Sequence, residues 1–147
     1  MIGLRYFCRE DAGTVQRALY PDMTLDAVEQ MISDWNTCVF RGRRFEMLAI
    51  AAEGEIIGYA SLREHSKDAV SFGIEIFPGE RGKGYASEAM RLLSEKTAED
   101  GYRLVMDQVR KDNRASIRLH EKHGFTTDGC IYRNKRDHEV IYYLKLL

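Results

Sequence analysis

The residues best suited to chemistry form a glycine-rich stretch, Arg81-Gly82-Lys83-Gly84-Tyr85-Ala86, which leads into a helix-forming run that begins at Ser87. Glycine adopts positive φ and carries no Cβ, so successive backbone N–H groups can converge on one anion at the positive end of a helix dipole. Arg81 and Lys83 add positive charge at the rim. The stretch predicts a phosphate-binding turn, and the simpler alternative is an ordinary basic turn before a helix.

A second segment, residues 113–125, predicts a short helix with clear ends. Asn113 is a good N-cap, and Gly124 suits the position just after the last turn. The apolar anchors of this helix are Ile117, Leu119 and Phe125. His120 lies among them, so a titratable ring is placed on a helix that follows the glycine-rich turn in the chain.

Together the two segments resemble the signature motifs of the GNAT superfamily of acetyl-CoA-dependent N-acetyltransferases. The first follows the pattern Arg/Gln-x-x-Gly-x-Gly/Ala, with Arg81, Gly84 and Ala86. The second follows Asn-x-x-Ala-x-x-Leu-Tyr-Glu-Lys-x-Gly-Phe from Asn113 onward, with two departures. Ser116 stands where Ala is usual, and His120 stands where Tyr is common.

The elements needed to hold these motifs can be read along the chain. Alternating or continuous apolar runs predict strands over residues 2–7, 45–52, 55–62, 70–77, 104–109, 130–133 and 139–146. Helical spacing and caps predict helices that start near Glu10, Thr24, Ser87 and Asn113. At 147 residues the chain has the size of one domain, residues 1–147. The basic stretch Arg41-Gly42-Arg43-Arg44 is predicted to be a turn in a solvated loop, with a binding patch as the alternative.

These elements indicate an α/β domain with helices packed on a mixed sheet. The resemblance implies an α+β arrangement of six or seven mostly antiparallel strands and four helices. It also implies that the fourth and fifth strands, the parallel strands before the glycine-rich turn and before Asn113, splay into a V.

The resemblance further implies that acetyl-CoA is the cosubstrate. No metal is expected, because His120 and His123 are three residues apart and His65 and His138 lack ligand clusters nearby. The diphosphate of acetyl-CoA is expected on the main chain from Arg81 to Ser87, and its pantetheine arm along the strand that ends at Ile76 and Phe77. Asn113 is expected to cap its helix and to bond the same arm. The cofactor-binding residues implied in this way are Ile76, Phe77, Arg81, Gly82, Lys83, Gly84, Tyr85, Ala86, Ser87 and Asn113.

Acetyl transfer to an amine places two demands on the site. A strand-edge N–H near Ile76 or Phe77 could stabilise the oxyanion. A free alkyl amine with a pKa of about 10.4 is less than about one part in a thousand neutral near pH 7, so a base is useful. Glu75 is the first candidate, with Asp107, Gln108 or an ordered water as substitutes.

His120 occupies the position of the family's general acid, a Tyr near the sulfur. An imidazole can donate or accept a proton near neutrality, so His120 is expected to protonate the leaving thiolate or to act in reverse as a base. The alternative is a solvent-exposed histidine on a helix surface.

The acceptor pocket of such a fold is expected between the loop Tyr20–Met23 and the hairpin around Asn134–His138. Asp22, Asp137 and Glu139 could attract a cationic amine there. The segment from Asp128 to Arg133 resembles the branch that acetylates protein N-termini, ribosomal proteins or small diamines. The predicted acceptor is therefore an amine-bearing small molecule or a peptide N-terminus, and the family suggests a homodimer through the last strands.

Several other functions are disfavoured. Lys plus Arg number 22 against 23 Asp plus Glu, so the formal charge of −1 gives no general attraction to nucleic acid or to an anionic membrane. The glycines match neither a P-loop nor a dinucleotide-binding fingerprint. Three scattered cysteines suit reduced thiols in a cytoplasmic protein. The main competing function is a catalytically silent domain that binds acyl-CoA as a sensor or partner module.

Overall fold

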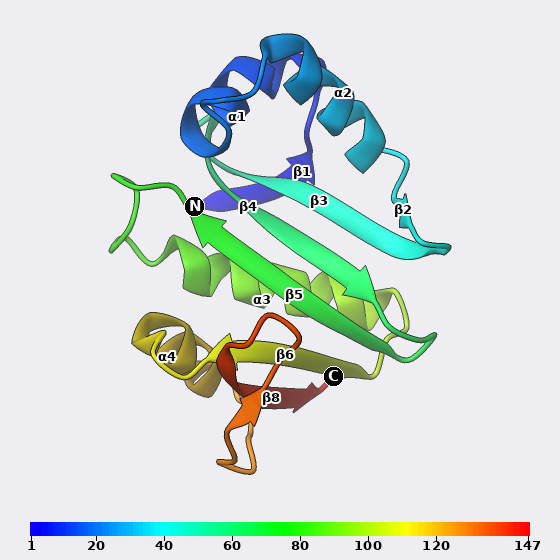
Figure 1. The fold of residues 1–147 in the computed structure, drawn as a ribbon, viewed down its shortest axis with the longest axis vertical. Helices are drawn as coiled ribbons and strands as arrows, with labels where there is room; N and C mark the ends of the chain where they lie inside the picture. Colours follow the sequence, from blue (N-terminus) through cyan, green and yellow to red (C-terminus); the bar gives the residue numbers. More distant parts are fainter.

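A mixed sheet of eight strands forms the centre of the molecule in the computed structural model, which describes residues 1–147 (Figure 1). Its order is β1-β3-β4-β5-β6-β8-β7, with β2 paired to β3 at one edge. The strands are β1 Ile2–Tyr6, β2 Val39–Phe40, β3 Arg43–Ala52, β4 Glu55–Glu64, β5 Ala69–Ile76, β6 Leu104–Arg110, β7 Tyr132–Arg133 and β8 Glu139–Leu146. All neighbours pair antiparallel except β5 and β6, as expected for the predicted α/β class.

The additional strand beyond the predicted seven is β2. Arg41 and Gly42 both have positive φ, 52° and 77°, which is the backbone of a two-residue hairpin turn. Val39 therefore pairs with Arg44 and Phe40 with Arg43. The turn predicted in this stretch is formed by Arg41 and Gly42, but the prediction of a solvated loop is wrong for Arg43 and Arg44, which begin β3 and pair with β2.

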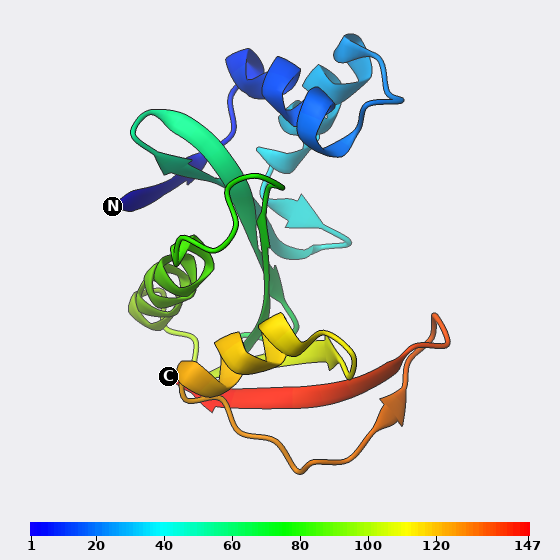
Figure 2. The same ribbon diagram turned by 90° about the vertical axis from the view of Figure 1, so that its left-hand side faces the viewer.

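The helices cover both faces of the sheet (Figure 2). They are α1 Ala12–Leu19, α2 Leu25–Trp35, α3 Tyr85–Glu99 and α4 Arg114–Lys122, with a short 3-10 helix, Arg9–Asp11, before α1. The pair α1 and α2 packs on one face, through Val15, Val28, Ile32 and Ala49 of β3. On the other face α3 packs through Leu93 and Met90, and α4 packs beside it through Ile117 and Leu119. No helix has both the length and the apolar character required to span a bilayer.

The caps that were predicted are formed. The Thr24 side chain accepts a hydrogen bond from the Ala27 amide at 3.1 Å, and the Asn113 side chain accepts one from the Ser116 amide at 3.1 Å. Gly124 has φ of 82° directly after the last turn of α4. These caps fix where α2 and α4 begin, and the start of α4 is what brings Asn113 to the splay of the sheet.

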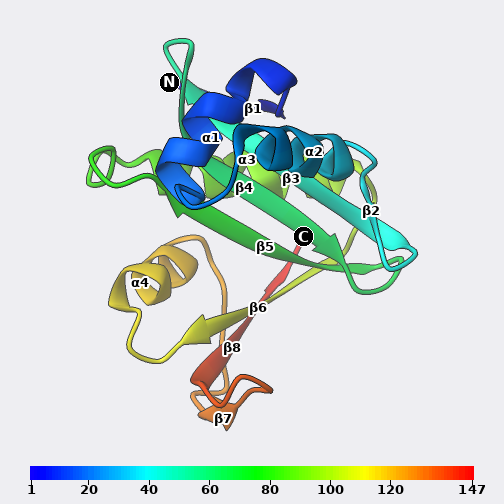
Figure 3. The ribbon, with the colours of Figure 1, turned by 45° about the horizontal axis from the view of Figure 1, so that its top comes forward.

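The parallel strands β5 and β6 pair over only two steps, Ala69 with Leu104 and Val70 with Val105. Beyond that point they diverge, and Figure 3 shows β6 and β8 running away from β5 with α4 beside the opening. The predicted V between the fourth and fifth of the predicted strands is confirmed. Its floor is held by side chains, since the Asp107 carboxylate accepts the Phe72 amide at 2.8 Å and the Ser71 hydroxyl donates to the Met106 carbonyl.

Candidate active site

The glycine-rich turn has the geometry predicted from its composition. Gly84 is the N-cap of α3 with φ of 81°, and Gly82 has φ of 80°. A Cβ built on either glycine would meet no atom within 4 Å, so the space above the turn is open. Because the first N–H groups of a helix have no intrahelical partner, the start of α3 presents free donors to this space.

A groove of about 660 Å³ runs from this turn between α3, α4 and the end of β5. Of the predicted cofactor-binding residues, those that line it are Ile76, Arg81, Gly82, Gly84, Tyr85, Ala86, Ser87 and Asn113. We call it the cofactor groove. Arg118 and Lys122 of α4 also line it and were not predicted as site residues. Their four-residue spacing places them on one helix face, and this signal was available in the sequence.

The cofactor groove suits a CoA-like group. Its rim carries the cationic side chains of Arg81, Arg118 and Lys122, and its end is the positive pole of α3. Two of the predicted residues lie outside it. Lys83 is bonded through Nζ to Glu80 at 2.9 Å and does not line the groove, and the Phe77 side chain is buried.

The edge of β5 beside the V has unpaired backbone groups. The Phe77 amide donates to the Ile57 carbonyl of the β4 side at 2.9 Å, so it is not free to stabilise an oxyanion as predicted. Alternate residues of an antiparallel strand direct their amides to the same side. Phe72, Ile74 and Ile76 therefore face the V, as the Phe72 bond to Asp107 shows. The available N–H groups are those of Ile74 and Ile76.

Glu75, the predicted base, lies at the cofactor groove. Its Oε1 atom accepts from Arg81 Nη2 at 2.7 Å, and the two side chains are 42% and 60% exposed. Arg81 also donates from Nε to the Ile76 carbonyl at 2.9 Å. The guanidinium thus holds Glu75 against the end of β5, on the side of the groove.

His120 is buried, which rules out the solvent-exposed alternative. Its Nδ1 lies 2.7 Å from the Ser116 carbonyl, and its Nε2 lies 2.7 Å from Asp107 Oδ2. A carbonyl only accepts, so Nδ1 carries a proton. The short contact between His120 Nε2 and the Asp107 carboxylate also requires a proton between the two atoms. The Asp107–His120 pair therefore shares one proton at this contact. The ring packs edge-on against Phe125, with centroids 4.7 Å apart.

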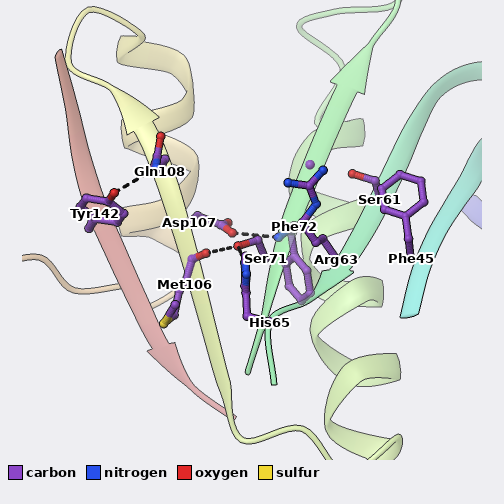
Figure 4. A pocket seen from close by; sticks show the side chains of 11 residues that line it. Phe45, Ser61, Arg63, His65, Ser71, Phe72, Met106, Asp107, Gln108 and Tyr142 are labelled. Carbon is purple, nitrogen blue, oxygen red and sulfur yellow. Dashed lines mark hydrogen bonds between the residues drawn. The ribbon is translucent and has the colours of Figure 1, made fainter. Parts of the chain in front are cut away.

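The face of the sheet toward α1 and α2 holds a cavity of about 560 Å³, shown in Figure 4. We call it the acceptor cavity. Ser61, Arg63 and His65 line it from β4 and the turn after it, and Gln108 and Tyr142 line it from the other arm of the V. These residues alternate with core residues along their strands, which places them on one face.

A chain of hydrogen bonds crosses the floor of the acceptor cavity (Figure 4). His65 Nε2 lies 2.6 Å from Ser71 Oγ, and the Ser71 hydroxyl donates to the Met106 carbonyl. Since the single hydroxyl proton is used on Met106, His65 Nε2 must be the donor to Ser71. In the neutral ring this leaves Nδ1 as an unprotonated acceptor. Sequence reasoning assigned no role to His65, because its partner Ser71 is on the next strand.

A small cavity of about 180 Å³ in the V lies between the two sites. It shares Ile74, Ser116 and Leu119 with the cofactor groove, and it shares Phe72, Gly73, Asp107 and Gln108 with the acceptor cavity. His120 also lines it. We call it the gap. The cofactor groove, the gap and the acceptor cavity therefore lie next to one another, in that order, from one face of the sheet to the other.

The predicted walls of the acceptor pocket are found only in part. Lys135 and Arg136 of the hairpin after β7 line a cavity next to the acceptor cavity, and Asn134 donates to Gln108 at 3.2 Å. The loop Tyr20–Met23 does not line the acceptor cavity.

At this hairpin the acidic residues expected to attract a cationic amine are paired with cations of the chain. Asp137 is bonded to Arg133 at 2.9 Å, and Glu139 is bonded to both Arg133 and Lys111. Asp22 belongs to the loop that lies outside the cavity.

Comparison with known proteins agrees with this geometry. Spore coat polysaccharide biosynthesis protein SpsD of Bacillus subtilis is 26% identical over 112 residues, which cover 76% of this chain and 39% of that protein. The L-methionine sulfoximine/L-methionine sulfone acetyltransferase of Pseudomonas aeruginosa is 30% identical over 88 residues, covering 56% of this chain and 51% of that protein. The chain thus spans about half or less of the length of these curated relatives.

Among solved structures, the fold resembles an acetyltransferase from Salmonella typhimurium that modifies the N-terminal serine of ribosomal protein L7/L12. The TM-score is 0.81 at 20% identity, over 99% of this chain and 95% of that one. The model of the acetyltransferase (GNAT) domain matches residues 3–126, which include the glycine-rich turn, Asn113 and His120. The chain belongs to the GNAT acetyltransferase family.

Proposed function

We propose that this protein is an N-acetyltransferase that moves an acetyl group from acetyl-CoA to a primary amine by direct attack in a ternary complex. The observation that carries this proposal is the row of adjoining cavities in the V, which places the cofactor groove next to the gap and the gap next to a separate cavity on the opposite face. A silent acyl-CoA sensor needs the groove but has no use for an acceptor cavity next to the gap.

When bound, acetyl-CoA supplies an activated acyl group as a thioester. Gly82, Gly84 and the first turn of α3 would hold its phosphates, with Arg81, Arg118 and Lys122 at the rim. The free edge of β5 at Ile74 and Ile76 can pair with an amide-rich arm as an extra strand would. One of these N–H groups is our candidate donor to the carbonyl oxygen.

Protons are handled by groups on both sides of the gap. We propose that the Asp107–His120 pair holds a proton at the gap and donates it to the sulfur of CoA as the thiolate leaves. Glu75 remains the proposed base, and His65 is a second candidate because its Nδ1 is free in the acceptor cavity. The acceptor amine is supplied by a small molecule or a peptide N-terminus.

Release of free thiol from acetyl-CoA tests the activity. The protein is incubated with acetyl-CoA and a panel of amino acids, amino sugars, polyamines and peptides, and the thiol is followed with time. An enzyme releases thiol only when a suitable amine is present. Absence of release across the panel, together with tight CoA binding, would favour the sensor.

Two helix caps provide a matched test of the cofactor groove. Asn113→Ala and Thr24→Ala each remove one cap, at a cost of about 1 kcal/mol to folding. Only Asn113 lines the groove, so only its variant should lose CoA affinity, by roughly tenfold. Equal CoA affinity in both variants would place the cofactor elsewhere.

A further inference from the structure

We infer that the acceptor amine belongs to a molecule that also carries an anionic group, a carboxylate or a phosphate, which binds to a cluster of cations beside the acceptor cavity. The cluster consists of Arg41, Arg43, Arg63, Lys135 and Arg136, and we call it the basic wall. This inference rests on the proposed function, because it concerns the acceptor of that same transfer.

The basic wall lines a cavity of about 620 Å³ that adjoins the acceptor cavity. The two cavities share Phe45, Arg63 and His65. A molecule bound in the acceptor cavity with its amine toward the gap would therefore have its distal part at the basic wall.

Strand register and hairpin geometry bring these side chains together. Arg63 of β4 lies opposite Phe45 of β3, and Arg43 shares a face with Phe45 because the two are two residues apart in the strand. Arg41 forms the turn before β3, and Lys135 and Arg136 form the turn between β7 and β8. Figure 2 shows that both hairpins project to the side of the sheet opposite α3.

The cations of the basic wall have no acidic partners. None of the five takes part in a salt bridge, whereas Arg44, which lines the same cavity, is bonded to Asp100 at 2.7 Å and to Glu46. The one acidic side chain that lines this cavity, Glu64, accepts a hydrogen bond from the Tyr102 hydroxyl at 2.5 Å.

Aromatic contacts support two of the guanidinium groups. Arg41 and Arg63 lie over the ring of Phe40, at 5.2 Å and 5.6 Å from its centroid. Such contacts hold a cation in place without neutralising its charge. The wall therefore keeps a local positive potential in a chain whose formal net charge is −1.

This potential has two consequences for the acceptor. An anionic group gains attraction and relieves the repulsion among the cations, while a polyamine adds to that repulsion. A positive environment also disfavours the protonated form of a nearby amine, so it lowers the pKa of the acceptor and raises the fraction that can attack.

The test compares pairs of acceptors that differ in the anion. Glucosamine 6-phosphate is compared with glucosamine, and L-methionine with L-methioninamide, while spermidine serves as the polycation. We expect kcat/KM to be about tenfold or more higher for the anionic member of at least one pair, and added salt to reduce the difference. The glucosamine pair tests a phosphate group and the methionine pair tests a carboxylate group, so the two pairs show which anion the protein prefers.

A variant and its control test the wall itself. Arg63→Gln should raise KM for the preferred anionic acceptor by about tenfold, with the KM for acetyl-CoA unchanged, and Arg63→Lys should restore part of the loss. Arg103→Gln is the matched control, since Arg103 is exposed, forms no salt bridge and does not line the basic wall or the acceptor cavity. Its kinetics should equal those of the wild type.

Calorimetry keeps the inference testable if turnover fails. The same acceptors are titrated into protein saturated with CoA. Tighter binding of the anionic members, lost in Arg63→Gln, supports the basic wall even when no amine is acetylated. In that case the proposed function fails, and the inference that the ligand is anionic remains. Turnover that is equal within both pairs, or highest with spermidine, overturns the inference and leaves the proposed function in place. Equal binding within both pairs also overturns it.

Discussion

His120 Nε2 lies 2.7 Å from Asp107 Oδ2 in a contact that is closed to solvent, with the two side chains 7% and 3% exposed. The other carboxylate oxygen of Asp107 accepts the Phe72 amide of β5, and His120 Nδ1 bonds the Ser116 carbonyl of α4. One buried pair thus joins α4 and β6 to β5 across the base of the V. The proton proposed to serve the reaction is thus also the one that holds these elements together.

Replacing His120 should separate these two roles. His120→Phe leaves the Asp107 carboxylate buried without its partner, which should cost about 3–5 kcal/mol of stability. His120→Tyr keeps a hydroxyl that can donate to Asp107, so we expect a smaller loss and a much higher kcat than in the Phe variant. Urea unfolding and steady-state kinetics measure the two effects. Both variants are assayed at temperatures at which they are equally folded. Equal kcat in the two variants would then remove His120 from the mechanism.

Gly84→Ala should weaken CoA binding more than it weakens folding. A non-glycine residue at φ of 81° costs roughly 1–2 kcal/mol, and the added methyl group enters the open space above the turn. We expect CoA affinity to fall by roughly tenfold or more. Gly101→Ala is the control, because Gly101 follows the other end of α3 with φ of 94° and also has an open Cβ position. It should show similar strain with unchanged affinity for CoA, as measured by calorimetry.

Gly73→Ala should obstruct the gap. A Cβ at this position would lie 2.6 Å from Ser61 Oγ, so the Ser61 side chain would have to move within the acceptor cavity. We expect kcat to fall and the KM for the amine to rise, while CoA affinity stays the same and stability falls by about 1 kcal/mol. Gly3→Ala in β1, where an added Cβ meets nothing within 4 Å, is the control. An unaltered kcat in Gly73→Ala would show that the acetyl group is not transferred to the amine beside Gly73.

Acidification should destabilise the protein through His123. Burial, with Lys145 and Lys122 nearby, lowers the pKa of His123, whose Nε2 lies 2.8 Å from Ser87 Oγ at the start of α3. The folded pKa is below the unfolded value of about 6.5, so the unfolded chain takes up the proton first. The contribution of neutral His123 is complete above that value and is lost as pH falls toward the folded pKa.

The matching variant is His123→Gln, whose amide can still bond Ser87. Its urea midpoint should fall less than that of the wild type between about pH 7.5 and about pH 5.5, because all other titrating groups are common to both proteins. The same pH dependence in both proteins would contradict the role assigned to His123.

Local signals allowed much of this structure to be predicted. Gly84 and Asn113 act through their own backbone and the adjacent helix turn, so their types and positions were sufficient. The same is true of the strands on either side of the V, whose apolar residues are frequent enough to indicate a strand. Strand β2 was missed although a turn was predicted at residues 41–44, because its two residues become a strand only by pairing with β3.

The partners within the site could not be found in this way. His120 and Asp107 are 13 residues apart and meet only because α4 packs back onto β6. Arg63 and Lys135 belong to hairpins that are distant in sequence and approach the same cavity through the register of the whole sheet. The Phe77 amide was expected to stabilise the oxyanion. It cannot do so, because amides alternate in direction along a strand and this one bonds Ile57 of β4.

The glycine turn at the start of α3 is formed by main chain, whereas the wall near Arg63 is formed by side chains. Backbone donors remain when side chains outside the glycine positions of the turn are substituted, but the charge of the wall can be reversed by a few substitutions. The scaffold can therefore keep its acyl donor while its preference for the second substrate is re-engineered, and the hairpins before β3 and between β7 and β8 are the segments in which to begin.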